Sequence, residues 1–392
     1  MSRAILPGAL VHGQPATLGV MGGGQLGRMF VHAAQAMGYF TAVLDPDAAS
    51  PAGLVSHHHI QTGYLDEQGL AQLMQRCAAI TTEFENVPAP ALTTLGAHRP
   101  VAPGADAVAI AQDRAAEKAH FVRCGVPVAP HASLETPAQL AAILSEGGDL
   151  FPGILKTSRM GYDGKGQIRV KTREQLSEAW AQLNNVPCVL EKMLPLQAEC
   201  SVIVARGADG QMVNFPVQLN LHREGILAVT SVYEGAVPVA LAEQAVAATR
   251  AVAEGLNYVG VLCVEFFILE GGQLVVNEMA PRPHNSGHYT MNACDQSQFE
   301  LQVRTLAGLP LTQPRQHSPS IMLNLLGDLW PEGASPAWDQ VLALPGVHLH
   351  LYGKLSARPG RKMGHLNITG ATPEAVRATA LQAAGLLGMQ AF

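Results

Sequence analysis

Two apolar segments around residue 270 constrain the fold more than any other part of the sequence. The first is Val261-Leu262-Cys263-Val264-Glu265-Phe266-Phe267-Ile268-Leu269, and the second is Leu274-Val275-Val276-Asn277-Glu278. The residues between them, Glu270-Gly271-Gly272-Gln273, have a Gly-Gly centre, which predicts a β-hairpin. If the turn is centred on the two glycines, the strands pair symmetrically about it and Glu265 lies directly opposite Glu278.

The opposed glutamates predict a metal site. Directly opposed side chains on paired strands have Cβ atoms roughly 4.5 to 5.5 Å apart. Two carboxylates at that separation repel each other unless a cation lies between them, and Mg²⁺ binds through one or two carboxylates plus phosphate oxygens. We therefore expect Glu265 and Glu278 to hold Mg²⁺, with Asn285 as a further oxygen ligand. The alternative is that one glutamate is protonated or points to solvent at a strand edge.

A glycine-rich segment earlier in the chain has the character of a phosphate-binding loop. Ile154-Leu155-Lys156 predicts a strand that ends in a lysine, and Gly161-Tyr162-Asp163-Gly164-Lys165-Gly166-Gln167 follows it. Lysines neutralise phosphates as compact charges, and glycines let the backbone close over them. The segment lacks the G-x-x-x-x-G-K-[ST] pattern, so it is not a Walker loop, and the alternative is an ordinary solvated hairpin. Downstream of Glu278, Arg282 suits a phosphate or a developing anion.

The first glycine motif, Gly22-Gly23-Gly24-Gln25-Leu26-Gly27, follows a short apolar strand and fits G-x-G-x-x-G. Asp45 lies about 20 residues further on, where a dinucleotide-binding fold places its ribose acid. Taken alone, the motif favours an NAD site. Glycine turns serve many ligands, however, and the same amides at a helix N-terminus could hold the phosphate of another substrate.

Apolar strands and helical patterns alternate at the start of the chain. Strands at 18–21, 41–44 and 78–82, with helices between them, predict a parallel sheet whose functional loops follow the strand ends. We expect a domain boundary near residue 115, and a proline-rich stretch after residue 310 predicts a linker to a small α+β unit. That unit is expected to end in a helix capped by Thr372-Pro373-Glu374. Residues 1–16 are expected to be a ragged extension.

Charge and composition exclude some classes of protein. With 25 Lys plus Arg against 31 Asp plus Glu, the formal charge of −6 has the wrong sign for a nucleic-acid binder with a basic face. No apolar run is long enough to span a membrane. Six dispersed cysteines without a C-x-x-C pair indicate a reducing cytoplasm.

Several motifs follow one another along the chain: Gly22 to Met29, Glu83-Phe84-Glu85-Asn86, Gly161 to Gln167, Glu265-Phe266-Phe267, Asn277 to His288, and Tyr352-Gly353-Lys354. In this order they resemble the N5-carboxyaminoimidazole ribonucleotide synthetase family of the ATP-grasp superfamily. The resemblance implies a mixed α/β and α+β chain, usually a homodimer. The chain would comprise a Rossmann-like pre-ATP-grasp domain (1–115), a two-part ATP clamp (116–310, with a lid at about 120–190) and a small C-terminal domain (311–392).

The resemblance also implies roles for individual residues. The ATP contacts would be Arg114, Lys156, Gly161, Tyr162, Asp163, Gly164, Lys165, Gly166, Gln167, Glu191, Lys192, Met193, Leu194, Glu199, His222, Asn277 and Glu278. The substrate, aminoimidazole ribonucleotide, would contact Gln25, Leu26, Glu83, Tyr162, Arg282, His284, Asn285, Ser286, Lys354, Arg361 and Lys362. Glu191 to Leu194 would read adenine through backbone groups, and Asp163, Lys354 and Arg282 would be catalytic.

The implied reaction is carboxylation of the substrate amine with ATP and bicarbonate, through carboxyphosphate, with Asp163 on the lid accepting the amine proton. A formate-dependent glycinamide ribonucleotide transformylase or a biotin-type carboxylase would share the clamp but not the Tyr162 to Gly166 loop. An NAD-dependent oxidoreductase leaves the opposed glutamates unexplained. A catalytically dead binding module would be expected to have lost Glu265, Glu278 or Lys156, and all three are present.

Overall fold

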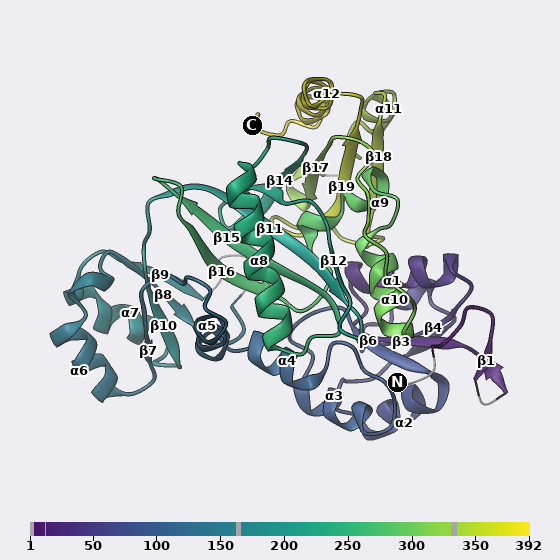
Figure 1. The fold of residues 1–392 in the computed structure, drawn as a ribbon, viewed down its shortest axis with the longest axis horizontal. Helices are drawn as coiled ribbons and strands as arrows, with labels where there is room; N and C mark the ends of the chain where they lie inside the picture. The colour runs from purple at the N-terminus through teal and green to yellow at the C-terminus, as the bar shows by residue number, and fades with distance from the viewer. Residues whose placement is uncertain (1–3, 12, 162–165, 331–334) are drawn as a thin grey trace.

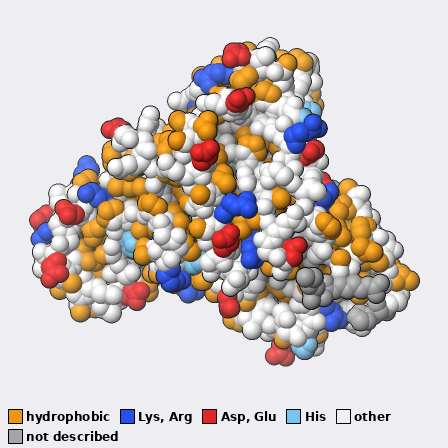
Figure 2. Space-filling view, viewed as in Figure 1, with side chains coloured by type: hydrophobic (Ala, Val, Ile, Leu, Met, Phe, Trp, Pro, Cys, Tyr) orange, Lys and Arg blue, Asp and Glu red, His pale blue; other side chains and the backbone are white. Residues whose placement is uncertain are grey.

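The computed structural model describes residues 4–11, 13–161, 166–330 and 335–392. The chain forms three lobes around a central sheet, with the N-terminal part in purple and dark blue, the second lobe in blue, and the C-terminal part in yellow-green (Figure 1). Acidic and basic side chains are interspersed on the face shown in Figure 2. Within the described ranges, no helix has the length and apolar character needed to cross a membrane.

The N-terminal lobe contains the predicted parallel sheet, in the order β5-β4-β3-β6. Its strands are β3 (Thr17–Met21), β4 (Phe40–Leu44), β5 (His58–Ile60) and β6 (Ala79–Thr82). Its helices are α1 (Gln25–Ala36), α2 (Glu67–Arg76), α3 (Ala89–Gly96) and α4 (Ala105–Ala111). The predicted strands are therefore confirmed to within one residue. Because all four strands run in the same direction, the loops that follow β3, β4 and β6 meet at one edge of the sheet.

The described residues before β3, which are 4–11 and 13–16, are more ordered than the predicted ragged extension. The strands β1 (Leu10–Val11) and β2 (Gln14–Pro15) form a two-stranded hairpin. The amide of Ile5 donates to the carbonyl of Ala307 at 2.8 Å, and the Tyr39 hydroxyl donates to the Ile5 carbonyl at 2.6 Å. These contacts fasten the segment to the first lobe and to the helix that ends at Ala307.

The second lobe is an antiparallel sheet, in the order β7-β10-β8-β9, covered by helices. Its elements are α5 (Arg114–Arg123), β7 (His131–Leu134), α6 (Pro137–Glu146), β8 (Gly153–Thr157), β9 (Gln167–Val170), α7 (Leu176–Gln182) and β10 (Cys188–Lys192). Lys156 pairs with Val189 across β8 and β10. Glu191, two residues further along β10, therefore lies diagonally across from Lys156 on the same face of the sheet.

One large sheet runs through the rest of the molecule, in the order β16-β15-β11-β13-β14-β17-β19-β18, with β12 beside β11. Its strands are β11 (Leu196–Arg206), β12 (Met212–Asn214), β13 (Gln218–Arg223), β14 (Ile226–Val232), β15 (Gly260–Leu269), β16 (Leu274–Ala280), β17 (Ser320–Leu326), β18 (Val347–Leu351) and β19 (Lys362–Thr369). The helices beside it are α8 (Val239–Gly255), α9 (Thr290–Ala293), α10 (Gln298–Ala307), α11 (Trp338–Leu342) and α12 (Pro373–Leu386). Because β14 pairs with β17, the sheet continues across the boundary predicted near residue 310.

Helices on the large sheet bury its apolar faces. Helix α8 lies across β11 and β15, where Val252 is fully buried with Leu262 and Val264 (Figure 1). Helix α12 buries Ala380 against Leu366 of the C-terminal strands. The predicted cap of α12 is confirmed, since the Thr372 side chain accepts a hydrogen bond from the amide of Ala375 at 3.2 Å.

The hairpin of β15 and β16 places Glu265 opposite Glu278, as predicted. The position of its turn differs from the prediction, and a β-bulge compensates for the difference. Ile268 pairs with Leu274 and Phe266 with Val276, so the turn is centred on Gly271 alone. That register by itself would oppose Glu265 to Asn277. A β-bulge between Phe266 and Glu265 inserts one extra residue on β16, which brings Glu278 opposite Glu265.

Candidate active site

A cavity of about 480 Å³ lies where the first lobe, helix α5 and the end of β16 meet. It brings together residues that are far apart in the sequence, including most of those predicted to form the substrate and metal sites. The predicted residues that line it are Gln25, Leu26, Glu83, Arg114, Gly161, Glu265, Glu278, Arg282, His284, Asn285 and Lys362. Glu117 and His288 also line it and were not among the predicted site residues.

The paired glutamates, predicted to hold the metal, both line the cavity. Burial, together with the charge of Glu278, raises the pKa of Glu265 to about 7. The Nη1 atom of Arg114 lies 3.1 Å from Oε2 of Glu278. Two carboxylates that repel each other at the wall of a cavity fit Mg²⁺, which needs only one or two protein carboxylates beside phosphate oxygens. No group of three or more His, Cys, Asp or Glu ligands is found among the described residues, so the donor set does not suit a fully protein-bound metal.

Asn285, predicted as the third metal ligand, is buried beside the cavity. Neither the oxygen nor the nitrogen of its side-chain amide has a hydrogen-bond partner within the described part of the chain. A buried amide without partners is costly unless a ligand satisfies it. Its position is therefore compatible with a metal or a substrate, and which of the two it binds stays a prediction.

Three buried charges lie between α5 and the sheet of the second lobe. Oε2 of Glu191 is 3.1 Å from Nζ of Lys118 and 3.1 Å from Nζ of Lys156. Although burial acts in the opposite direction, Lys156 and Lys118 lower the pKa of the Glu191 carboxyl. The cluster therefore has two ammonium groups for one carboxylate, and an anionic ligand such as a triphosphate would complete its charge balance.

Lys118 was not among the predicted site residues. It lies four residues after Arg114 on α5, and this spacing puts both side chains on one face of the helix. The side chain of Asp113 caps the helix by accepting hydrogen bonds from the amides of Ala115 and Ala116. The i, i+4 spacing after a capping aspartate is the signal that could have identified Lys118.

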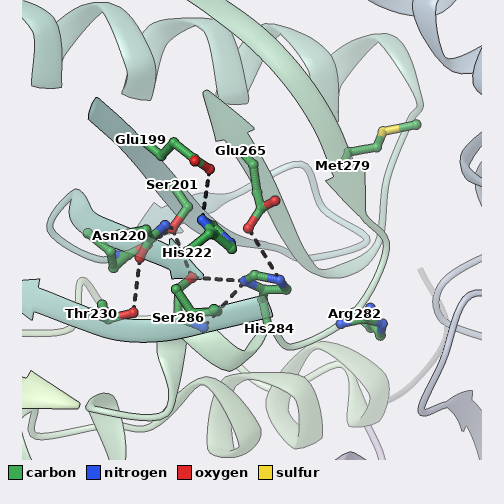
Figure 3. Close-up of polar contacts among 12 residues, drawn as sticks. Glu199, Ser201, Asn220, His222, Thr230, Glu265, Met279, Arg282, His284 and Ser286 are labelled. Atoms are coloured by element: carbon green, nitrogen blue, oxygen red, sulfur yellow. Dashed lines mark hydrogen bonds and ion pairs between the residues drawn. The ribbon is translucent and has the colours of Figure 1, made fainter. Parts of the chain in front are cut away.

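Glu199 and His222, both predicted ATP contacts, lie side by side on β11 and β13. Oε2 of Glu199 is 2.8 Å from Nδ1 of His222 (Figure 3). Burial alone would lower the pKa of His222, but the hydrogen bond to Glu199 and the charge of Glu265 raise it above its usual value. The pair is thus fixed in orientation before any nucleotide binds.

Beneath the cavity, a chain of buried polar side chains orients the loop after β16 (Figure 3). Nε2 of His284 lies 3.4 Å from Oε1 of Glu265, and its Nδ1 lies 2.9 Å from Oγ of Ser286. The hydroxyl of Ser201 donates to Oγ of Ser286 at 2.8 Å and accepts from Nδ2 of Asn220 at 2.8 Å. Ser286 is fully buried, so the structure gives it a supporting position under His284, and its predicted contact with substrate stays a prediction.

Arg282, predicted as catalytic, is countered by a carboxylate. Its Nε donates to Oε2 of Glu85, and Glu85 belongs to the loop after β6. Arg282 holds the pKa of the Glu85 carboxyl below its usual value even though burial acts to raise it. The ion pair fastens the first lobe to the loop after β16 and leaves the guanidinium on the cavity wall.

The first glycine turn is occupied by protein carboxylates. The Glu83 side chain accepts hydrogen bonds from the amides of Gly24 at 2.7 Å and Gly27 at 2.9 Å. Asp45, predicted as a ribose acid under the NAD interpretation, accepts from the amide of Gly23 at 2.7 Å and from the Tyr64 hydroxyl at 2.7 Å. A pyrophosphate would meet these carboxylates at the helix N-terminus, so the structure argues against the dinucleotide interpretation and against a phosphate on these amides.

Some of the other predicted residues that the structure describes do not line the cavity, among them Lys354, Arg361, Lys192 and Met193. Nζ of Lys354 donates to the carbonyl of Lys362 at 2.6 Å, and Arg361 donates to the carbonyl of Ser356 at 2.8 Å. The amides of Lys192 and Met193 donate to the carbonyls of Pro130 and Pro152, both at 2.9 Å, so other backbone groups of this segment would have to read a nucleobase. Tyr162, Asp163, Gly164 and Lys165 lie outside the described residues.

Sequence models of three domain families match consecutive parts of the chain. They are the ribonucleotide synthetase preATP-grasp domain at residues 15–112, the ATP-grasp domain at residues 119–299, and the phosphoribosylaminoimidazole carboxylase C-terminal domain at residues 320–379.

Several proteins are similar to this chain over nearly its whole length. N5-carboxyaminoimidazole ribonucleotide synthase from Brucella melitensis is 44% identical over 352 residues, which cover 89% of this chain and 95% of the relative. A solved N5-carboxyaminoimidazole ribonucleotide synthetase in complex with ADP superimposes with a TM-score of 0.89 at 38% identity, covering 98% of each chain. The Aspergillus clavatus enzyme, solved with ADP and 5-aminoimidazole ribonucleotide, gives 0.85 at 32% identity, covering 95% of this chain and 99% of that one. At this identity and coverage, the chain belongs to the N5-carboxyaminoimidazole ribonucleotide synthase family.

Proposed function

We propose that this protein uses ATP and bicarbonate to carboxylate the 5-amino group of 5-aminoimidazole ribonucleotide in purine biosynthesis, releasing ADP and phosphate. The observation that carries the proposal is the cavity in which the opposed pair Glu265 and Glu278 faces residues of the first lobe. The ADP and 5-aminoimidazole ribonucleotide held by the Aspergillus clavatus relative support both substrates. The protein is thus an ATP-dependent ligase with an ATP-grasp domain.

The protein's charged groups can bind and orient a triphosphate. Lys118 and Lys156 share one carboxylate and retain an excess positive charge for phosphate oxygens. Glu199, held by His222, can accept hydrogen bonds from ribose hydroxyls. Glu265 and Glu278 would hold Mg²⁺, which would neutralise phosphate charge and polarise the transferred phosphoryl group.

In the reaction, an oxygen of bicarbonate forms a bond to the γ-phosphorus while the bond from that phosphorus to the ADP oxygen breaks. The product is carboxyphosphate. The 5-amino nitrogen then forms a bond to the carboxyl carbon, either in carboxyphosphate or in CO₂ released from it, and inorganic phosphate leaves. Asp163 would accept the proton lost by the amine, and Lys354 and Arg282 would stabilise the negative charge. Water must be excluded because carboxyphosphate hydrolyses, and the loop from Gly161 to Gln167 would be the lid that does so.

The assay that tests the proposal measures ADP release with ATP, Mg²⁺ and bicarbonate, with and without 5-aminoimidazole ribonucleotide. We expect release to depend on both bicarbonate and the ribonucleotide. Release that does not respond to the ribonucleotide would refute the substrate, and release supported by formate in place of bicarbonate would favour a transformylase.

A variant at the glutamate pair tests the metal assignment. Glu278→Gln keeps the size of the side chain but removes one of the two charges, so we expect ADP release to fall by a hundredfold or more at fixed Mg²⁺, in line with the loss of one strong electrostatic contact at a transition state. Glu270→Gln, at the exposed turn of the same hairpin, is the matched control and should retain full activity. Full turnover by Glu278→Gln would exclude the metal assignment.

We also assign the protein to the cytoplasm and to homodimers, as the resemblance implies. Sedimentation of the purified protein at micromolar concentration should give twice the chain mass of 41.3 kDa. Sedimentation at the mass of a single chain across that range would refute the dimer.

A further inference from the structure

His288 lies on the wall of the cavity, and neither the resemblance nor the mechanism above gives it a role. It follows the loop after β16 and has only 1% of its surface exposed. Its carbonyl accepts a hydrogen bond from Nδ2 of Asn367 at 2.8 Å, which fixes the backbone at this point. A polar ring that is so nearly buried yet reaches a ligand cavity is a candidate for substrate recognition.

The position of the proton on the His288 ring follows from its neighbour Gln298. Oε1 of Gln298 accepts from the amide of His284 at 2.9 Å, and Nε2 donates to the carbonyl of His284 at 2.8 Å. These two backbone groups have unambiguous roles, so they establish which end of the Gln298 amide is nitrogen. The same Nε2 lies 3.0 Å from Nδ1 of His288. Nδ1 must therefore accept, and the proton of the neutral ring lies on Nε2.

The ring is also held in place and kept neutral. It lies 4.6 Å from the ring of His365 and 5.7 Å from that of Phe299, measured between centroids. Burial lowers the pKa of His288 well below its usual value, and the nearby charges of His350, Lys362 and Arg282 act in the same direction. His288 thus presents a fixed N–H donor without adding another positive charge.

The ligand that suits this donor is anionic. No hydrogen bond to Nε2 of His288 is found among the residues that the structure describes, so a ligand in the cavity is what this N–H would meet. Lys362 and Arg282 line the same cavity and lie close enough to His288 for their charges to lower its pKa. Two cations and a neutral N–H donor are the chemistry that binds a phosphate monoester.

We propose that Nε2–H of His288 donates a hydrogen bond to the phosphate of the bound ribonucleotide, and that Gln298 is the positioning residue that keeps this proton on Nε2. The inference rests on the proposed function, because it takes the ribonucleotide as the ligand of this cavity. It adds a neutral donor to the cations predicted to bind the phosphate.

The test compares two ligands in the parent protein and three variants by calorimetry: 5-aminoimidazole ribonucleotide, and the riboside that lacks the phosphate. His288→Leu should weaken binding of the ribonucleotide about tenfold or more, as expected for a lost hydrogen bond to a charged group, and leave riboside binding within about twofold. His288→Gln, which retains an amide N–H near the position of Nε2, should recover part of the loss. His348→Gln, a half-buried histidine on β18, is the control and should match the parent protein. Equal weakening of both ligands by His288→Leu, or no weakening of either, would overturn the proposal.

A second measurement does not require the Leu variant to fold. In protein labelled with ¹⁵N-histidine, the His288 signals, identified by their absence in His288→Gln, should show a protonated Nε2 and a bare Nδ1, and ribose 5-phosphate should shift the Nε2 signal. A proton on Nδ1, or no response to ribose 5-phosphate, would refute the assignment. Gln298→Glu should move the proton to Nδ1, since a carboxylate can only accept there. Because ribose 5-phosphate carries no amine, this result is independent of whether the ribonucleotide stimulates ADP release.

Discussion

Replacement of Glu191 by Gln is the sharpest stability test of the site. The carboxylate is the shared partner of Lys118 and Lys156, each 3.1 Å away, and all three side chains are nearly buried. With an effective dielectric constant of about 20, each attraction is worth roughly 5 kcal/mol. The two ammonium groups cannot be more than about 6 Å apart, so their repulsion is at least roughly 3 kcal/mol. Glu191→Gln removes both attractions and leaves the repulsion in place.

We expect Glu191→Gln to lower the free energy of unfolding by about 3 to 5 kcal/mol, the range for an ion pair broken inside a protein. The assay is urea unfolding without nucleotide, followed by the fluorescence of Trp180, which lies in the core of the same lobe. Glu178→Gln, at an exposed position on α7, is the control.

The decisive comparison is the double variant Glu191→Gln/Lys118→Met. Removing Lys118 from the Gln background also removes one uncompensated charge, so we expect the double variant to be about 1 to 3 kcal/mol more stable than Glu191→Gln alone. In the parent background, Lys118→Met should be destabilising or neutral. If Lys118→Met lowers stability by the same amount in both backgrounds, the three charges do not act as a unit and the reasoning is refuted.

Two further predictions concern buried carboxylates. Glu83→Ala should lower the free energy of unfolding by about 2 to 5 kcal/mol, because the amides of Gly24 and Gly27 both lose their acceptor; a change below about 0.5 kcal/mol in urea unfolding would contradict the capping role. Burial and the charge of Glu278 raise the pKa of Glu117 from 4.5 to about 8, so between these values the folded protein holds a proton that the unfolded chain has released. Stability of the metal-free protein should therefore fall as pH rises through this window, by at most about 1.4 kcal/mol per pH unit from this group. Glu117→Gln should flatten that part of the pH profile, and an unchanged profile would show that Glu117 is ionised.

The local features of the fold could be predicted from sequence patterns. Short apolar runs predict strands at 18–21 and 41–44, and the structure has them at 17–21 and 40–44. Thr372 before Pro373 predicts the cap of α12. The prediction that Glu265 faces Glu278 is also correct, although it rested on a turn centred between Gly271 and Gly272. The turn is instead centred on Gly271, and the β-bulge at Asn277 restores the pairing of Glu265 with Glu278. No glycine marks the bulge in this segment, which reads Leu274-Val275-Val276-Asn277-Glu278.

Pairings between distant segments could not be predicted in this way. Lys118 meets Glu191 only because α5 packs beside β10, and Arg282 meets Glu85 only because two lobes come together. Each of these partners is ordinary in its own local sequence, and its role depends on packing that no local pattern encodes. The pairings also explain why the predicted catalytic Arg282 is fastened to a carboxylate rather than placed alone in the cavity.

The first glycine motif shows how a structural rule could improve such predictions. In the parallel sheet, Met21 of β3 pairs with Thr82 of β6, so the residue after Thr82 lies beside the glycine turn that follows Met21. A glutamate at that point can reach the N-terminus of α1, and Glu83 does so through two backbone amides. A dinucleotide needs those amides free. An acidic residue directly after the strand beside a G-x-G-x-x-G turn is therefore an argument against a dinucleotide site that can be read from the sequence alone.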